Sequence, residues 1–205
     1  MRKQPQLLWK MKLKVKKPKD FRTHQFFVGL GNPGSTYEKT RHNAGFWILD
    51  RLSENYSATF RKPLFKPYLK AQVIHTTLIK PLTYINKSGA VLPLVIPKNR
   101  DPLIIIITDN MDLEPGRVRI KTKLGSGGGH NGIKSIIQSY GSDPWVMTLG
   151  IGRPKHGQSI VEYVLGEPDS LEWNAIHKGI DKAVTSLSLI MEGDIEGGMY
   201  ALSQP

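Results

Sequence analysis

The sequence contains no cysteine, and this absence removes several kinds of chemistry at once. It excludes disulfide bonds, thiolate metal sites and a cysteine nucleophile, and it permits an intracellular setting without establishing one. Long hydrophobic runs are missing as well. The apolar run at residues 103–108 is far shorter than the roughly 20 residues that a membrane-spanning helix requires. We therefore expect a soluble protein with no membrane partner.

Acidic residues are scarce except near the C-terminus. The 205 residues include 29 Lys and Arg against 17 Asp and Glu, a net charge of +12. Residues 1–22 carry nine basic residues and one acid, whereas residues 160–205 carry two basic residues and eight acids. A lysine-rich arm on a basic body suits a polyanionic partner such as nucleic acid. The alternatives are an anionic membrane surface, less favoured because the arm lacks an amphipathic face, and charge that serves only solubility.

Length and composition predict one domain. A chain of this size with 39% hydrophobic residues can bury one good core, so we expect one domain at residues 23–205. We also expect the protein to be a monomer. Residues 1–22 are predicted to form a disordered basic arm, because they are charge-rich and have little to bury. The arm is rich in lysine and free of serine, which favours a cytoplasmic location over a mitochondrial targeting signal.

Segments typical of strands alternate with segments typical of helices. The run at 103–108 predicts a central strand buried on both faces, because it is continuously β-branched or leucine. This alternation predicts a single three-layer α/β domain with a twisted, mixed and largely parallel sheet flanked by helices. The predicted strands cover residues 25–30, 71–80, 103–108, 117–123 and 146–152, and the predicted helices cover 40–56, 88–96, 130–140 and 170–191.

Two distant segments each place a histidine before an asparagine. His42 follows the turn GLGNPG, and His130 follows a run of glycines. Histidine exchanges a proton near neutral pH, and asparagine offers neutral hydrogen-bond donors and acceptors. In sheets of this kind ligands bind beyond the carboxyl ends of the strands, where Asn32 and Asp109 are also expected. Together these residues indicate hydrolytic chemistry at a polar site.

The glycines also allow other interpretations. Residues 29–34 match G-x-G-x-x-G, the dinucleotide fingerprint, but Pro33 sits inside the turn and no acid falls at the next strand end. The segment 127–135 misses the phosphate-binding loop pattern, and Ser126 lacks the strand–serine–helix elbow of a nucleophile. No HExxH motif or cluster of carboxylates indicates a metal. We expect a water nucleophile, no metal and no cofactor.

Five blocks of specific residues follow one another along the sequence. They are GLGNPGSTYEKTRHNAGFWILDRL (29–52), KPLTYINKSG (80–89), TDNMDLEPGRVRIK (108–121), GGGHNGIKSII (127–137) and LGIGRP (149–154). In this order they resemble the signature blocks of the bacterial-type peptidyl-tRNA hydrolase family. The resemblance spans about residues 25–192 and implies one α/β domain. It also implies an enzyme that cleaves the ester between a peptide and the 3′-terminal ribose of tRNA.

The resemblance assigns roles to individual residues. It implies that His42 is the general base, that Asp109 is its carboxylate partner and that Asn32 helps distinguish a blocked peptidyl group from a free amine. Side-chain amides of Asn32, Asn86 or Asn131 could bind the oxyanion. The resemblance further implies substrate contacts at the following positions: Tyr37, Tyr84, Asn86, Asn131, and Lys121 and Lys123 near the tRNA 5′-phosphate.

Competing interpretations remain for several of these residues. Asp112 is the nearest rival of Asp109, Asn32 could be only a turn former, and His130 could merely order the glycine loop and stays outside the catalytic set. Thr148 stands where the family often has a basic residue, which puts half of the phosphate clamp in doubt. The alternative function is a non-catalytic RNA-binding relative of the organellar splicing type. Asn32, His42 and Asp109 together favour the enzyme.

Overall fold

The structure is a computed structural model, and it describes residues 24–97, 102–122, 130–140, 144–154 and 157–204. The predicted arm at residues 1–22, together with Lys123 and Ser126, lies outside the described residues. Within the described part, no helix has the length and apolar character needed to cross a membrane.

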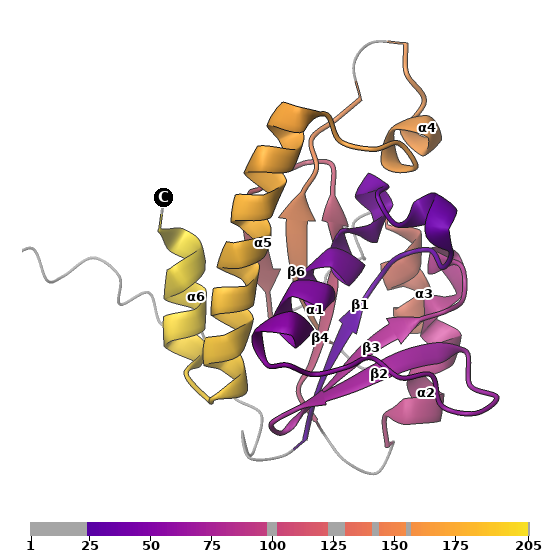
Figure 1. Ribbon diagram of the computed structural model, residues 1–205, viewed down its shortest axis with the longest axis vertical. Helices are drawn as coiled ribbons and strands as arrows, with labels where there is room; N and C mark the ends of the chain where they lie inside the picture. Colours follow the sequence, from indigo (N-terminus) through magenta and orange to yellow (C-terminus); the bar gives the residue numbers. More distant parts are fainter. Residues whose placement is uncertain (1–23, 98–101, 123–129, 141–143, 155–156, 205) are drawn as a thin grey trace, which may run out of the picture.

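One sheet of six strands forms the centre of the domain, in the order β2-β3-β1-β4-β6-β5 (Figure 1). The four inner strands run parallel to their inner neighbours, and the two edge strands, β2 and β5, are antiparallel. The predicted mixed and largely parallel sheet is therefore confirmed. The strands are β1 (Gln25–Gly29), β2 (Tyr68–Val73), β3 (Thr76–Pro81), β4 (Ile104–Asn110), β5 (Val118–Lys121) and β6 (Trp145–Gly150).

Helices cover both faces of the sheet and make the three predicted layers. On one face α1 (Ala44–Asn55), α5 (Ser170–Met191) and α6 (Ile195–Ser203) pack on a core that includes Ile105 and Ile107. On the other face the 3₁₀ helix η3 (Ile85–Val91), α2 (Leu92–Val95) and α3 (Asn131–Tyr140) pack on Ile104 and Ile106 (Figure 1). Successive residues of β4 point to opposite faces of the sheet and pack in different cores, as expected of a strand buried on both faces.

Several element boundaries differ from the prediction. The single extended segment at 71–80 is a β-hairpin, β2 and β3, which turns at Ile74 and His75. The helix expected at 88–96 begins earlier as η3 and continues as α2. The short helices η1 (Ser35–Tyr37), η2 (Arg41–Asn43) and α4 (Ile160–Val164), and the C-terminal α6, were not predicted as separate elements. Asp109 lies inside β4, one residue before its end.

Helix α1 approaches the sheet closely at Gly45. A Cβ atom at this position would lie 2.3 Å from the carbonyl oxygen of Ile107 and 2.4 Å from the amide nitrogen of Leu30. Both contacts are to backbone, which cannot rotate away as a flexible side chain could. Only glycine allows the start of α1 to sit against β1 and β4, and this contact fixes the preceding turn η2 beside the end of β4.

We predict that Gly45→Ala destabilises the protein by about 1–3 kcal/mol, because the added methyl group overpacks a rigid backbone contact. Alanine favours a helix more than glycine does, so a gain in stability would contradict the close approach. Urea denaturation measures the change. Asn174→Ala, at an exposed position of α5, is the control and should leave the midpoint equal or slightly higher.

Candidate active site

A cleft of about 960 Å³ opens at the carboxyl ends of the parallel strands. Its walls come from the loop after β1, η2, the start of η3, the end of β4, the edge of β5 and β6, the start of α3, and α4. The lining residues include nearly all of the predicted site residues: Asn32, His42, Tyr84, Asn86, Asp109, Lys121 and Asn131.

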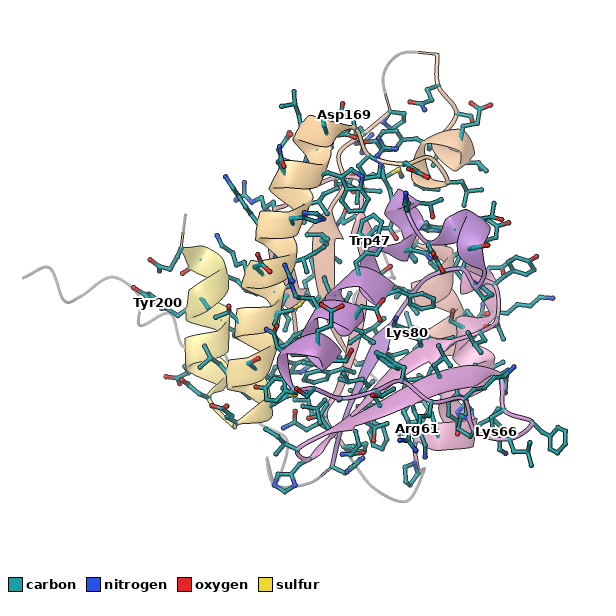
Figure 2. All side chains as sticks on the ribbon, in the orientation of Figure 1. Trp47, Arg61, Lys66, Lys80, Asp169 and Tyr200 are labelled. Carbon is teal, nitrogen blue, oxygen red and sulfur yellow. The ribbon has the colours of Figure 1, made fainter. Side chains whose placement is uncertain are left out.

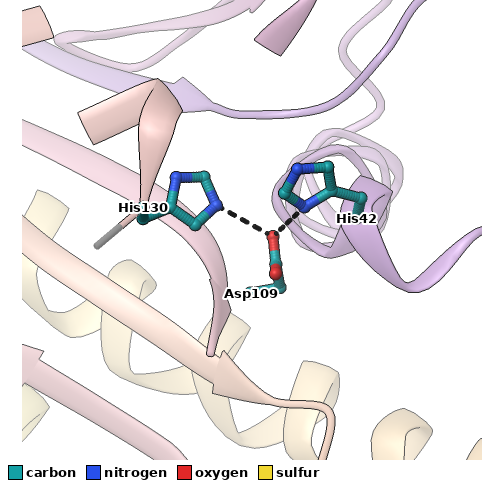
Figure 3. Close-up of side chains that lie close together, drawn as sticks. All are labelled: His42, Asp109 and His130. Atoms are coloured by element: carbon teal, nitrogen blue, oxygen red, sulfur yellow. Dashed lines mark hydrogen bonds and ion pairs between the residues drawn. The ribbon is translucent and has the colours of Figure 1, made fainter. Parts of the chain in front are cut away.

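Asp109 stands at the centre of the site, between two imidazoles (Figure 3). Its Oδ1 lies 2.9 Å from Nδ1 of His42 and 3.2 Å from Nε2 of His130, and its side chain is 3% exposed. Burial would raise the pKa of this carboxyl group. The charges of His130 and His42 and their hydrogen bonds outweigh burial and hold the pKa well below its usual range. Asp109 is therefore ionised at neutral pH.

His42 is oriented by this carboxylate. Because Nδ1 donates its proton to Asp109, Nε2 is the unprotonated nitrogen, and it is available to accept a proton from a ligand in the cleft. Burial lowers the pKa of His42, but the attraction and hydrogen bond of Asp109 are together stronger, and the net shift is upward. A basic imidazole with a free nitrogen facing a cleft is suited to general base catalysis.

His130 has the opposite tautomer. Its Nδ1 accepts a hydrogen bond from the backbone N–H of Gly132 at 3.2 Å, so Nε2 carries the proton and faces Asp109 and the hydroxyl of Thr108. This bond also caps the start of α3, the helix that carries Asn131. His130 therefore caps the start of α3 and donates a hydrogen bond to the central carboxylate, whereas the glycine loop that it was predicted to order lies outside the described residues.

The three groups could also hold a metal ion. One nitrogen of His42, one of His130 and a carboxylate oxygen of Asp109 lie within 4.8 Å of one another. A divalent ion there would have to displace the proton that each imidazole now donates to Asp109. With both imidazoles donating to Oδ1 of Asp109, the arrangement also fits a proton relay.

Asn32 is held by two neighbours. The side chain of Asn43 binds its backbone on both sides, accepting from its N–H at 2.8 Å and donating to its carbonyl oxygen at 3.0 Å. Oδ1 of Asn32 accepts the N–H of Ile85 at 3.0 Å, which identifies the amide oxygen and leaves its NH₂ group for the cleft. Asn32 is therefore more than a turn former: it presents a fixed hydrogen-bond donor.

Arg41 anchors the turn that carries His42. Its buried guanidinium donates to the carbonyl oxygen of Tyr163 at 3.1 Å and to the carboxylate of Glu172 at 2.6 Å. It also lies 4.2 Å from the ring centre of Tyr163, as in a cation–π contact. Since Tyr163 is in α4 and Glu172 in α5, one side chain ties the turn η2 to both helices.

The basic strand β5 borders the cleft. Lys121 pairs with Val146 and Arg119 with Thr148 across the antiparallel β5–β6 ladder. Paired residues project to the same face, so Arg119 and Lys121 share the face on which Val146 and Thr148 line the cleft. Side chains alternate along the strand, because Arg119 and Lys121 are exposed while Val118 is buried.

Among the described residues, one predicted site residue does not line this cleft. Tyr37, in η1, is half-buried and does not line it, and Lys123 lies outside the described residues. Asp112, the rival of Asp109, is exposed and pairs with Arg153.

Sequence reasoning missed the apolar wall that α4 contributes to the cleft. This wall has a signal in the sequence: Ser159 and Glu162 form a capping box that starts α4. The wall residues are Ile160, Val161, Val164 and Leu165, joined by Met111.

Comparison with known proteins defines the class of this fold and site. An α/β domain with a histidine–carboxylate pair at the carboxyl edge of its sheet is an arrangement used by hydrolytic enzymes. Residues 26–204 match the model of the peptidyl-tRNA hydrolase family. The chain belongs to this family.

Individual relatives agree. The chain is 41% identical over 187 residues to the peptidyl-tRNA hydrolase of Lactococcus lactis, covering 85% of this chain and 97% of that protein. It is 43% identical over 164 residues to that of Bacillus pumilus, covering 77% and 87%. The crystal structure of peptidyl-tRNA hydrolase from Acinetobacter baumannii superposes with a TM-score of 0.78 at 32% identity, covering 87% of this chain and 94% of that chain.

We predict that Asp109→Asn shifts the titration of His42 to lower pH. The substitution removes the charge that raises the pKa of His42 and leaves the burial that lowers it. NMR of the imidazole protons across a pH series measures the change, with His75 on the β2–β3 turn as the reference signal. An unmoved titration of His42 would contradict the pairing.

Proposed function

We propose that this protein hydrolyses the ester bond between a peptide and the 3′-terminal ribose of tRNA, with His42 as the general base. The observation that carries the proposal is the pair of His42 and the ionised Asp109 inside a cleft lined with asparagine amides. The sequence relatives and structural neighbour described above all bear the name peptidyl-tRNA hydrolase.

In the first step a water molecule loses a proton as it attacks the ester carbonyl. Nε2 of His42 takes this proton, because Nδ1 is already committed to Asp109. The resulting imidazolium is stabilised by the carboxylate, which stays ionised. The same proton then passes to the departing 3′-oxygen of the ribose, so that the reaction needs no other acid.

The tetrahedral intermediate carries a negative oxygen that needs hydrogen-bond donors already in place. The NH₂ group of Asn32 is held toward the cleft by the bond between its Oδ1 and Ile85. Asn131, at the start of α3, and Asn86, in η3, line the same cleft and add further amides. Neutral donors stabilise the oxyanion without lowering the basicity of His42.

The tRNA is bound through both stacking and charge. Tyr84 lines the cleft and is 60% exposed. Its ring is therefore accessible for stacking on an unpaired base of the acceptor end. Lys121 and Arg119 offer two cations for a phosphate. Arg119 pairs with Thr148 across the strand ladder, so it supplies a positive charge beside the position where the family often has a basic residue. Contacts by Lys123 and by the arm, a substrate role for Tyr37, a cytoplasmic location and a monomeric state remain predictions.

A purely RNA-binding role is the other candidate. A protein that only binds RNA has no use for an imidazole whose free nitrogen faces a cleft and whose other nitrogen is fixed by a buried carboxylate. The His42–Asp109 pair therefore favours the enzyme.

We predict that His42→Ala lowers turnover of an N-acetylated aminoacyl-tRNA by about a hundredfold or more, the usual contribution of a positioned general base. Affinity for uncharged tRNA should be largely retained. Single-turnover ester cleavage and filter binding measure the two quantities. His177→Ala, at an exposed position of α5, is the control. Turnover like that of the wild type would exclude His42 as the base.

A second prediction separates binding from chemistry. Lys121→Gln should reduce the slope of log affinity for tRNA against log salt by roughly 0.7–0.9, because one phosphate contact is lost. The Michaelis constant should rise while kcat is unchanged, since the lost contact acts equally in the ground and transition states. Lys178→Gln, at an exposed position of α5, is the matched control. A loss of kcat on a short N-blocked substrate would contradict the assignment.

A further inference from the structure

A second basic surface lies on the far edge of the sheet, at β2 and the loop that precedes it, residues 61–67. Residues 55–100 contain eight Lys and Arg and no Asp or Glu. The side chains of Arg61, Lys62, Lys66 and Lys70 are exposed, and none forms an ion pair with a carboxylate of the described residues. Figure 2 shows Arg61 and Lys66 at this edge.

The tip of this loop displays two apolar side chains. The N–H of Lys66 donates to the carbonyl oxygen of Pro63 at 3.1 Å and closes a turn with Leu64 and Phe65 at its centre. Phe65 has a φ of 56°, a left-handed conformation that such turns normally give to glycine or asparagine. Its side chain is 92% exposed and that of Leu64 is 79% exposed. The protein therefore holds an aromatic ring in solvent at a conformational cost.

The base of the loop carries a second unfavourable feature. Arg61 and Lys70 form an antiparallel bridge with both N–O distances at 2.9 Å. Residues paired in this way project to the same face, and like charges directly opposite each other repel. Neither the left-handed backbone of Phe65 nor the like-charged pair of Arg61 and Lys70 stabilises the fold. Conflicts of this kind are expected at functional sites.

We propose that the 61–67 loop and the outer edge of β2 bind an unpaired RNA segment, with Phe65 stacking on a base and the surrounding cations on phosphates. An anion between Arg61 and Lys70 relieves their repulsion. Base–aromatic stacking flanked by cations is the common way in which proteins hold single-stranded nucleic acid. Two apolar residues are few for a membrane anchor, which buries a broad apolar face.

The RNA held here is distinct from the acceptor end bound in the cleft. β2 and β5 are the two edges of the sheet, so this loop and Lys121 are separated by the four strands between them. The loop still adjoins the cleft, because Leu82 N–H donates to Pro67 O at 2.8 Å and the chain then leads to Tyr84. The choice of RNA, but not the anionic site itself, rests on the proposed function.

The test is binding of a fluorescent single-stranded RNA 12-mer to the full chain, with a saturating acceptor-stem minihelix present to occupy the cleft. Phe65→Ala should weaken binding by about 5- to 150-fold, the effect of losing one stacked base. Arg61→Gln combined with Lys66→Gln should reduce the salt slope by about 0.7 for each lost contact. The matched controls, Leu171→Ala for the exposed apolar residue and Lys178→Gln for the charge, should change neither quantity.

Phe65→Asn separates function from stability. Asparagine tolerates the left-handed conformation, so this variant should be as stable as the wild type or more stable in urea while it binds the 12-mer as weakly as Phe65→Ala. Turnover of a short N-blocked substrate is the folding control and reports separately on the proposed hydrolysis.

Three outcomes would overturn the proposal. The first is 12-mer binding that is insensitive to Phe65 and to both cations. The second is complete loss of the Phe65-dependent binding when the minihelix is added, which would assign the surface to the substrate itself. The third is Phe65-dependent binding to vesicles of anionic lipid or to polyglutamate in the absence of any such binding to RNA.

Discussion

The ionised carboxylate of Asp109 is the constraint on which the rest of the site depends. A charge that is almost fully buried is costly unless it is paired and hydrogen-bonded. Two imidazoles meet this requirement, one from the turn before α1 and one from the cap of α3. Both helices must therefore converge on the end of β4. Gly45 makes the approach of α1 possible, because it has no side chain and lets the helix pack directly on the backbone of Leu30 and Ile107. The electrostatics of one group thus fix how both helical layers meet the sheet.

Much of this arrangement could be predicted from local sequence. The run at 103–108 predicted the central strand, because a continuous β-branched run is typical of a strand buried on both faces. Helix α5 begins where predicted, because Asp169 and Glu172 form a capping box at its start. The β2–β3 hairpin was missed because its turn contains Ile74, at a φ of 50°, where glycine or asparagine would have signalled it.

The contacts within the site were harder to predict, since they depend on residues far apart in sequence. His130, at the cap of α3, contacts Asp109, which lies 21 residues earlier in the sequence. The choice between Asp109 and Asp112 depended on burial, because Asp112 reaches solvent and pairs with Arg153. Family resemblance supplied what local patterns could not, while the role of Arg119 became visible only through the strand register.

The side chain of Arg41 has a consequence for how the shape of the cleft can change. It binds Tyr163 and Glu172 while its neighbour in sequence is the proposed base, so the apolar wall of α4 and the reacting nitrogen share one anchor. A backbone shift that widened the cleft would break this anchor and displace His42. A change in the shape of the cleft that keeps this anchor is therefore an exchange of side chains on α4, such as those at Ile160 and Val161. Such exchanges alter the lining of the cleft and leave the contacts of Arg41 in place.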